Sequence, residues 1–307
     1  MPVQPLRIGT RGSPMALIQA GVVRNRLLVA HPERAVELVT IRTTGDRVQT
    51  RLLSEIGGKG LFTKEIEEAL FDGRIDLAVH SLKDMETVLP TGLAIGAVLP
   101  RDDPRDALVA RDGAGLANLP QGARIGTASL RRRAQLLRLR PDLDVAPIRG
   151  NVDTRLNKLA SGEVDALVVA LCGLERLGKA EIVSEILEPA VMLPAVGQGA
   201  LAIECREADE RMRQLLVPLN DRDSAACVAA ERAMLAALDG SCRTPIAGLA
   251  TIGGDRLHLE ALLLSPDGDA ERRGQIAGAI GDAVALGSDA GAELRRLAGP
   301  GFFLAGC

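Results

Sequence analysis

The chain has 307 residues, of which 47% are hydrophobic and 25% charged, and its formal net charge is −3 at pH 7. This length allows two or three domains, and the acidic balance excludes a general nucleic-acid binder, which needs a basic face. Four Phe with no Trp or Tyr leave almost no side chains on which bases could stack. Residues 1–6 lack the pattern of a secretory signal, and no apolar run reaches the roughly 18 residues of a membrane span. We therefore expect a cytoplasmic protein that binds neither nucleic acid nor membrane.

The first part of the chain alternates between segments typical of strands and segments typical of helices. In chain order we predict a strand at 6–10, a helix at 14–30, a strand at 36–43, a helix at 61–71 and a strand at 76–81. Right-handed crossovers between such strands favour a mainly parallel sheet. Residues 44–60 form an insertion rich in Gly and charge, and an insertion of this composition beside a binding site is a candidate lid.

A second stretch repeats this order. Residues 7–13 recur as 124–129, and residues 73–79 recur as 162–169. The repeat predicts strands at 123–127, 143–148 and 166–171, and helices at 129–139 and 152–160. Each copy turns at a Gly-Thr pair into a helix whose first residues include Ser, so each offers free backbone N–H groups of the kind that bind anions. We expect two lobes with an anion-binding cleft between them.

The last part of the chain has a different pattern. Residues 193–205 read as a turn and an apolar strand, which could return to the sheet of the first lobe. An Ala-rich helix at 224–238, a hairpin at 246–264 and a helix at 289–297 then predict a small α+β domain. The expected fold class is therefore α/β, with two lobes of mainly parallel sheets and this C-terminal domain. The domain boundaries that we predict are 1–99 with 200–217, 100–199, and 218–307.

Two opposite charges follow directly on the apolar strand at 76–81. Lys83 and Asp84 should therefore lie at the carboxyl end of the strands, where open α/β sheets bind their ligands. The alternative is a solvated ion pair in a loop.

Arginines gather where the predicted helices begin. Arg131, Arg132 and Arg133 could form only the exposed face of a helix, which is the usual place of a charge run. However, the first turn of a helix disfavours cations unless an anion is present, and Arg149 and Arg155 repeat this pattern at the next helix. Guanidinium groups bind carboxylates in a bidentate manner, so we expect a small ligand with many negative charges. The arginines expected to line its site are Arg11, Arg131, Arg132, Arg149, Arg155 and Arg176.

The five cysteines show no metal-binding or disulfide spacing, and the three histidines lie far apart in the sequence, so we expect no metal site. Cys172, Cys205 and Cys227 lie in apolar stretches typical of inert packing residues. Cys242 differs because it follows the helix stop at Gly240 and has Arg243 beside it. A neighbouring cation favours the thiolate, which is the reactive form of a nucleophilic cysteine.

Six linked segments resemble, in this order and spacing, the porphobilinogen deaminase family over nearly the whole chain. They are residues 57–62, 78–84, 126–132, 149–156, 193–206 and 238–245. The resemblance implies three domains, the first two similar to periplasmic binding proteins. It also implies an enzyme that deaminates four porphobilinogen molecules and condenses them head to tail on a dipyrromethane cofactor, one per chain, bound through a thioether to Cys242. Hydrolysis would then release hydroxymethylbilane. Each pyrrole carries an acetate and a propionate, which agrees with the anionic ligand expected from the arginines.

The resemblance also assigns roles to single residues. It makes Asp84 catalytic. It assigns the cofactor carboxylates to Lys83, Ser129, Arg131, Arg132 and Arg155, the substrate and the growing chain to Arg11, Ser13, Arg149 and Arg176, and the lid to Lys59 and Phe62. The chain departs from the family pattern at Met85-Glu86, Asp153 and Cys172, and Glu86 adds a negative charge near the predicted site.

We expect a monomer, because no heptad pattern is present, and a product that passes to uroporphyrinogen-III synthase. The alternative function is a non-enzymatic two-lobed binding protein for a small polycarboxylate. It would account for the repeat, the insertion and the arginines, but not for Cys242 or the third domain.

Overall fold

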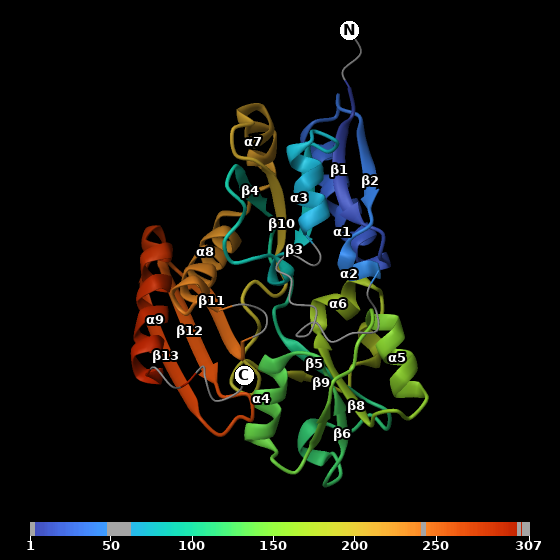
Figure 1. Cartoon of the computed structure of the whole chain (residues 1–307), viewed down its shortest axis with the longest axis vertical. Coiled ribbons are helices and arrows are strands. Elements are labelled where there is room, and N and C mark those ends of the chain that lie inside the picture. Colours follow the sequence, from blue (N-terminus) through green and yellow to red (C-terminus); the bar gives the residue numbers. More distant parts are fainter. Residues whose placement is uncertain (1–3, 48–62, 241–243, 300–301, 303–307) are drawn as a thin grey trace. The chain divides into compact units, whose positions relative to one another are not determined.

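The computed structural model describes residues 4–47, 63–240, 244–299 and 302 (Figure 1). The chain divides into two compact units. The first consists of Met1–Arg101 and Ala200–Ala225, and the second of Asp102–Gly199 and Ala226–Cys307. The C-terminal elements fall in the same unit as the second lobe, and the division into three domains stays a prediction. Among the described residues, every helix is too short or too polar to cross a membrane.

The first unit is built on a five-stranded sheet of order β2-β1-β3-β10-β4. Its strands are β1 (Leu6–Arg11), β2 (Val36–Ile41), β3 (Leu77–Ser81), β4 (Leu93–Val98) and β10 (Leu201–Arg206). Its helices include α1 (Pro14–Ala30), the short α2 (Thr44–Arg47), α3 (Lys64–Phe71), the 3-10 helix η1 (Leu82–Asp84) and α7 (Glu210–Leu216). The predicted return of the chain to this sheet is confirmed, because β10 lies between β3 and β4. Ile203 on β10 is fully buried in one core with Ile8 and Leu77 and so fixes the strand in place.

The second unit contains another five-stranded sheet, of order β7-β6-β8-β5-β9. Its strands are β5 (Asp106–Ala110), β6 (Arg124–Gly126), β7 (Asp144–Ala146), β8 (Ala166–Ala170) and β9 (Glu185–Leu187). The helices that follow β6, β7 and β8 are α4 (Leu130–Leu139), α5 (Val152–Ala160) and α6 (Leu171–Arg176). The strand order matches that of the first sheet position by position, which confirms the repeat.

The predicted fold class is confirmed, and each sheet is mixed because one of its five strands runs opposite to the other four. β1 pairs parallel with β2 and β3, and β6 pairs parallel with β7 and β8. β10 and β5 instead pair antiparallel with both of their neighbours. β5 and β10 each come directly after a point where the chain passes from one unit to the other. Neither strand is joined to its sheet by a βαβ crossover, which is the connection that makes consecutive strands parallel.

The C-terminal elements form the predicted α+β arrangement. An antiparallel sheet of β11 (Ile246–Gly253), β12 (Arg256–Leu264) and β13 (Glu271–Ala279) packs with α8 (Arg222–Ala237) and α9 (Ala283–Ala298). Met234, Leu259 and Leu294 are buried together between these elements. Two buried glycines of α9, Gly287 and Gly291, face the backbone of α8, so the two helices approach more closely than side chains would allow.

Candidate functional site

The first turn of α4 lies inside the protein. Ser129 caps the helix, with its Oγ accepting a hydrogen bond from the Arg132 amide at 3.4 Å. Arg131 and Arg132 are only 4% and 6% exposed. The alternative of an exposed charged face is therefore wrong for these two arginines. Arg133 does lie nearer the surface, where its Nη1 donates to Asp267 Oδ1 at 3.0 Å and to the Pro266 carbonyl at 2.7 Å.

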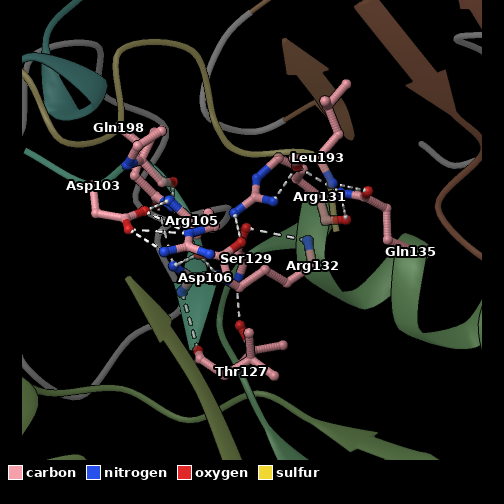
Figure 2. Close-up of polar contacts among 12 residues, drawn as sticks. Asp103, Arg105, Asp106, Thr127, Ser129, Arg131, Arg132, Gln135, Leu193 and Gln198 are labelled. Carbon is pink, nitrogen blue, oxygen red and sulfur yellow. Dashed lines mark hydrogen bonds and ion pairs between the residues drawn. The ribbon is translucent and has the colours of Figure 1, made fainter. Parts of the chain in front are cut away.

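The anion that these buried arginines require is Asp106, the first residue of β5 (Figure 2). Arg131 Nη2 donates to Asp106 Oδ2 at 2.7 Å, and Arg132 donates to Oδ1 from Nη2 at 2.7 Å and from Nε at 3.1 Å. Gln198 Nε2 adds a donor to Oδ1 at 2.8 Å. The sequence predicts an anion at this helix start but does not identify it as Asp106. The sequence does place a carboxylate directly before the apolar run 107–110. Asp102 and Asp103 lie close to it, however, and the sequence does not show which of the three aspartates binds the arginines.

Asp106 is charged in the folded protein. Complete burial alone would raise the pKa of this carboxyl group, but the guanidinium groups of Arg131 and Arg132 lower it well below its ordinary value. Hydrogen bonds from Arg132 and Gln198 act in the same direction. Two cations and one anion therefore share this interior position, and one positive charge remains in excess.

One donor of the arginine pair has no acceptor in the part of the chain that the structure describes. Arg132 uses all three nitrogens, since its Nη1 donates to the Val168 carbonyl at 3.1 Å in addition to the bonds to Asp106. Arg131 Nη1 donates to the Leu193 carbonyl at 2.6 Å, but its Nε is buried and has no partner among the described residues. A buried, unpaired donor on a guanidinium group is unfavourable unless an acceptor is supplied. This position suits a ligand that brings a carboxylate oxygen.

The start of α5 adds Arg149 and Arg155. Asn151 caps this helix, with its Oδ1 accepting from the Thr154 amide at 2.8 Å. Arg155 Nε donates to the carbonyl of Gly150 at 2.9 Å, and Gly150 itself has a φ of 110°, which only glycine adopts without strain. Because β6 and β7 are adjacent and parallel, α4 and α5 begin at the same edge of the sheet. The structure therefore places the two pairs of arginines along one edge.

Arg176, at the end of α6, is bound by protein groups. Its Nε donates to Asp102 Oδ2 at 2.8 Å, and its Nη2 donates to the carbonyl of Gly199 at 2.8 Å. Asp102 and Gly199 are the first and last residues of the 102–199 segment, and the Asp102 amide also donates to the Gly199 carbonyl at 3.3 Å. Arg176 thus ties the two ends of this segment together.

In the first unit, four predicted residues gather at the carboxyl ends of β1 and β3. These two strands are parallel neighbours. Arg11 ends β1, and Ser13 caps α1 by accepting a hydrogen bond from the Ala16 amide at 3.3 Å. Lys83 and Asp84 follow β3 in η1. The carboxyl-edge position that the sequence predicted for Lys83 and Asp84 is confirmed.

Buried neighbours hold the Lys83-Asp84 turn in place. Leu82 and Met85 are buried, and the Leu82 amide donates to the Ala200 carbonyl at 3.0 Å. Asp84 is exposed and Lys83 half-buried. Met85 thus fills an apolar position despite departing from the family pattern, while Asp84 is left accessible to a ligand.

Comparison with known proteins identifies the family. The family model described as porphobilinogen deaminase, dipyromethane cofactor binding domain, matches residues 6–214, and that of the porphobilinogen deaminase C-terminal domain matches residues 225–296. The chain is 54% identical over 299 residues to a porphobilinogen deaminase of Nitrobacter hamburgensis, covering 96% of this chain and 94% of the relative. It is 53% identical over 304 residues to a porphobilinogen deaminase of Paracoccus denitrificans, covering 98% and 97%.

The chain belongs to the porphobilinogen deaminase family. It is therefore an enzyme of tetrapyrrole synthesis, a transferase that acts on porphobilinogen and carries a dipyrromethane cofactor. The family expected from the six sequence segments is confirmed, and the alternative of a non-enzymatic binding protein is not favoured. Among solved structures, the periplasmic aliphatic sulphonate binding protein SsuA from Escherichia coli resembles the chain with a TM-score of 0.42 and 16% identity, covering 77% of this chain and 71% of that one.

The described residues fit the cofactor of porphobilinogen deaminases. The excess positive charge beside Asp106 and the unpaired Nε of Arg131 suit a group that carries several carboxylates. Three predicted site residues, Lys59, Phe62 and Cys242, lie outside the described part of the chain. The interpretation of Cys172, Cys205 and Cys227 as packing residues is confirmed, because all three are buried and burial raises the pKa of the Cys205 thiol to about 11.

Proposed function

We propose that this enzyme deaminates four porphobilinogen molecules, condenses them head to tail, and releases hydroxymethylbilane by hydrolysis. The observation that carries this proposal is the buried Arg131–Arg132 pair, which has more positive charge and more hydrogen-bond donors than Asp106 can satisfy. A polycarboxylate pyrrole chain supplies both the missing charge and the missing acceptors. The dipyrromethane group supplies the terminal pyrrole carbon to which substrate units are joined.

Asp84 is the proposed catalytic residue. Loss of ammonia from porphobilinogen leaves a positively charged pyrrole, and a fixed carboxylate stabilises such a charge. Asp84 suits this role because it is exposed at the sheet edge, while the buried Leu82 and Met85 on either side of the turn fix the backbone. Preorganised groups of this kind cost no reorganisation during the reaction.

The remaining roles follow the charges of the site. We propose that Lys83, Ser129, Arg131, Arg132 and Arg155 hold the carboxylates of the cofactor. Arg11, Ser13, Arg149 and Arg176 then hold those of the substrate and the growing chain. For Arg176 this role requires the ligand to compete with Asp102, because that carboxylate and the Gly199 carbonyl now bind its guanidinium group.

We further propose that the cofactor is attached through a thioether to Cys242 and that Lys59 and Phe62 belong to a lid over the site. The protein is proposed to act as a cytoplasmic monomer that binds neither nucleic acid nor membrane, and its net charge of −3 supports the exclusion of nucleic acid. Its product is proposed to pass to uroporphyrinogen-III synthase.

An intact mass spectrum tests the attachment. Protein made in a haem-synthesising host should exceed its sequence mass by two linked pyrrole units, and Cys242→Ala should lack this increment. Cys172→Ala is the matched control, because Cys172 is a buried cysteine that packs in α6. The cofactor proposal fails if the wild-type mass equals the sequence mass, and the attachment site is wrong if Cys242→Ala keeps the increment.

A further inference from the structure

Asp106 has every feature of an internal counter-ion. It is completely buried, and its two carboxylate oxygens accept four hydrogen bonds, three of them from the guanidinium groups of Arg131 and Arg132. Two buried cations at the start of a helix are unfavourable without an anion, because both desolvation and the helix dipole oppose them. Asp106 supplies that anion from a different element, β5.

The same contacts fix the direction of each guanidinium group (Figure 2). Arg131 is held on one side by Asp106 and on the other by the Leu193 carbonyl at 2.6 Å. Leu193 is itself held by Gln135, which accepts from its amide at 2.8 Å and donates to its carbonyl at 3.0 Å. The guanidinium group of Arg131 therefore cannot turn without breaking a closed set of bonds, and its Nε is the donor left over.

We propose that Asp106 is a positioning residue, which assembles the arginine pair before the cofactor arrives. Its charge cancels one of the two positive charges, so the pair stays buried and ordered in the cofactor-free protein. The remaining charge and the Nε of Arg131 are then already in place for an incoming pyrrole carboxylate. This inference rests on the proposed role of Arg131 and Arg132 in holding the cofactor.

Asp106→Asn tests the inference, because it keeps the shape of the side chain and removes its charge. Asp103→Asn is the matched control. Among the described residues, the carboxylate of Asp103 binds Arg105, at 3.0 Å and 2.6 Å, and not the Arg131–Arg132 pair. Cofactor-free proteins, made in a host that lacks porphobilinogen, are mixed with porphobilinogen, and the gain of two pyrrole units is followed by intact mass. The folded fraction is measured by circular dichroism under the same conditions.

We expect Asp106→Asn to load roughly tenfold more slowly or worse per folded molecule, the scale of one lost hydrogen bond to a charged group. Asp103→Asn should load at the wild-type rate. A merely structural role would change the folded fraction and leave the rate per folded molecule unchanged, so a wild-type rate for folded Asp106→Asn overturns the inference. An equal slowing in Asp103→Asn overturns it as well.

If Asp106→Asn does not fold, Asp106→Glu tests the same inference. The glutamate keeps the counter-charge but displaces the carboxylate by one methylene, so the protein should fold and still load more slowly than Asp103→Asn. Loading at the wild-type rate would overturn the inference. If wild-type protein gains no pyrrole mass at all, the proposed function fails instead, and the two failures are thereby distinguished.

Discussion

At the scale of single residues, Asp84 carries the proposed chemistry. We predict that Asp84→Asn, which is nearly isosteric but neutral, loses roughly 10²- to 10³-fold in turnover, the usual cost of removing one electrostatic stabiliser. The variant should keep its covalent cofactor, because the binding arginines of α4 and α5 are untouched. Turnover is measured by steady-state assay and the cofactor by intact mass.

Two further variants control this prediction. Asp84→Glu should retain a little activity, since the charge survives and only its position changes. Glu86→Gln should be near normal, because Glu86 is a departure from the family pattern and no role is proposed for it. If Asp84→Asn proves near normal, the catalytic carboxylate lies elsewhere, and Glu86 becomes the first residue to examine.

Glu67 is a buried carboxyl group with no proposed role in the chemistry. Burial raises its pKa, and the nearby Glu204 adds to the rise, although the neighbouring Thr63 and His80 act in the opposite direction. A raised pKa in the folded state means that folding favours the neutral form, so this contribution to stability is present at low pH and is lost as the pH rises through the folded value. Glu67→Gln, which mimics the neutral form, should therefore raise the melting temperature at pH 8.

The difference in melting temperature between Glu67→Gln and the wild type should disappear near pH 4, about the pKa of an unperturbed glutamate. At that pH the Glu67 carboxyl group of the folded wild type is neutral as well. Thermal unfolding of both proteins across this range measures the difference. Glu68→Gln is the matched control, since Glu68 is its exposed neighbour on α3 and should change little at either pH. A destabilised Glu67→Gln variant at pH 8 would show that the ionised carboxylate is needed.

At the scale of elements, the approach of α9 to α8 depends on glycine. A Cβ at Gly291 would lie 2.5 Å from the carbonyl oxygen of Met234 and 2.7 Å from Ala237 Cβ. Alanine ordinarily stabilises a helix by about 1 kcal/mol relative to glycine, but backbone atoms cannot yield as a flexible side chain can. We predict that Gly291→Ala destabilises the C-terminal elements by about 1–3 kcal/mol. Denaturant unfolding measures the change.

Gly281→Ala provides the comparison for that variant. Gly281 is exposed just before α9, and a Cβ there would meet nothing within 4 Å. The variant should therefore be neutral. Equal effects of the two substitutions would mean that backbone entropy, and not the close contact of the helices, decides the outcome.

Elements whose signal is local could be predicted from the sequence. The bounds predicted for α1 and α5 agree with the structure, because a capping Ser13 or Asn151 precedes a helical apolar pattern in each case. β13 gave no such signal, since its residues are largely polar or glycine and its position is set by pairing with β12. β5 was missed because it opens on a charged residue, Asp106.

The site residues with a local sequence signal could likewise be predicted, whereas those placed by distant contacts could not. The positions of Lys83, Asp84 and the helix-start arginines followed from the local order of strand, turn and helix. Asp106 could not be identified locally, because its contacts join residues 25 and 26 positions apart on α4 and 92 positions apart at Gln198. The sequence predicts an anion beside these arginines but does not distinguish an internal carboxylate from a bound one, and the structure contains the internal one.

At the scale of the whole molecule, the same strand order occurs twice, and each copy brings cations to the carboxyl ends of its parallel strands. Three of these cations have carboxylate partners among the described residues. Arg131 and Arg132 share Asp106, and Arg176 binds Asp102, but the Nε of Arg131 has no hydrogen-bond partner among the described residues. The protein is therefore built to fold with an internal anion in place and to gain further stability from an external one.

We predict from this that the cofactor-free protein melts at a lower temperature than the cofactor-bound protein. A ligand that binds only the folded state stabilises it, and carboxylates beside the arginines also relieve repulsion between like charges. Cys242→Ala, which should not retain the cofactor, should melt with the cofactor-free wild type. Added salt should raise both of these melting temperatures toward that of the bound form, because it screens the same repulsion. Equal melting temperatures for cofactor-free and cofactor-bound wild type, measured in one buffer at low salt, would contradict a role for these arginines in holding the cofactor.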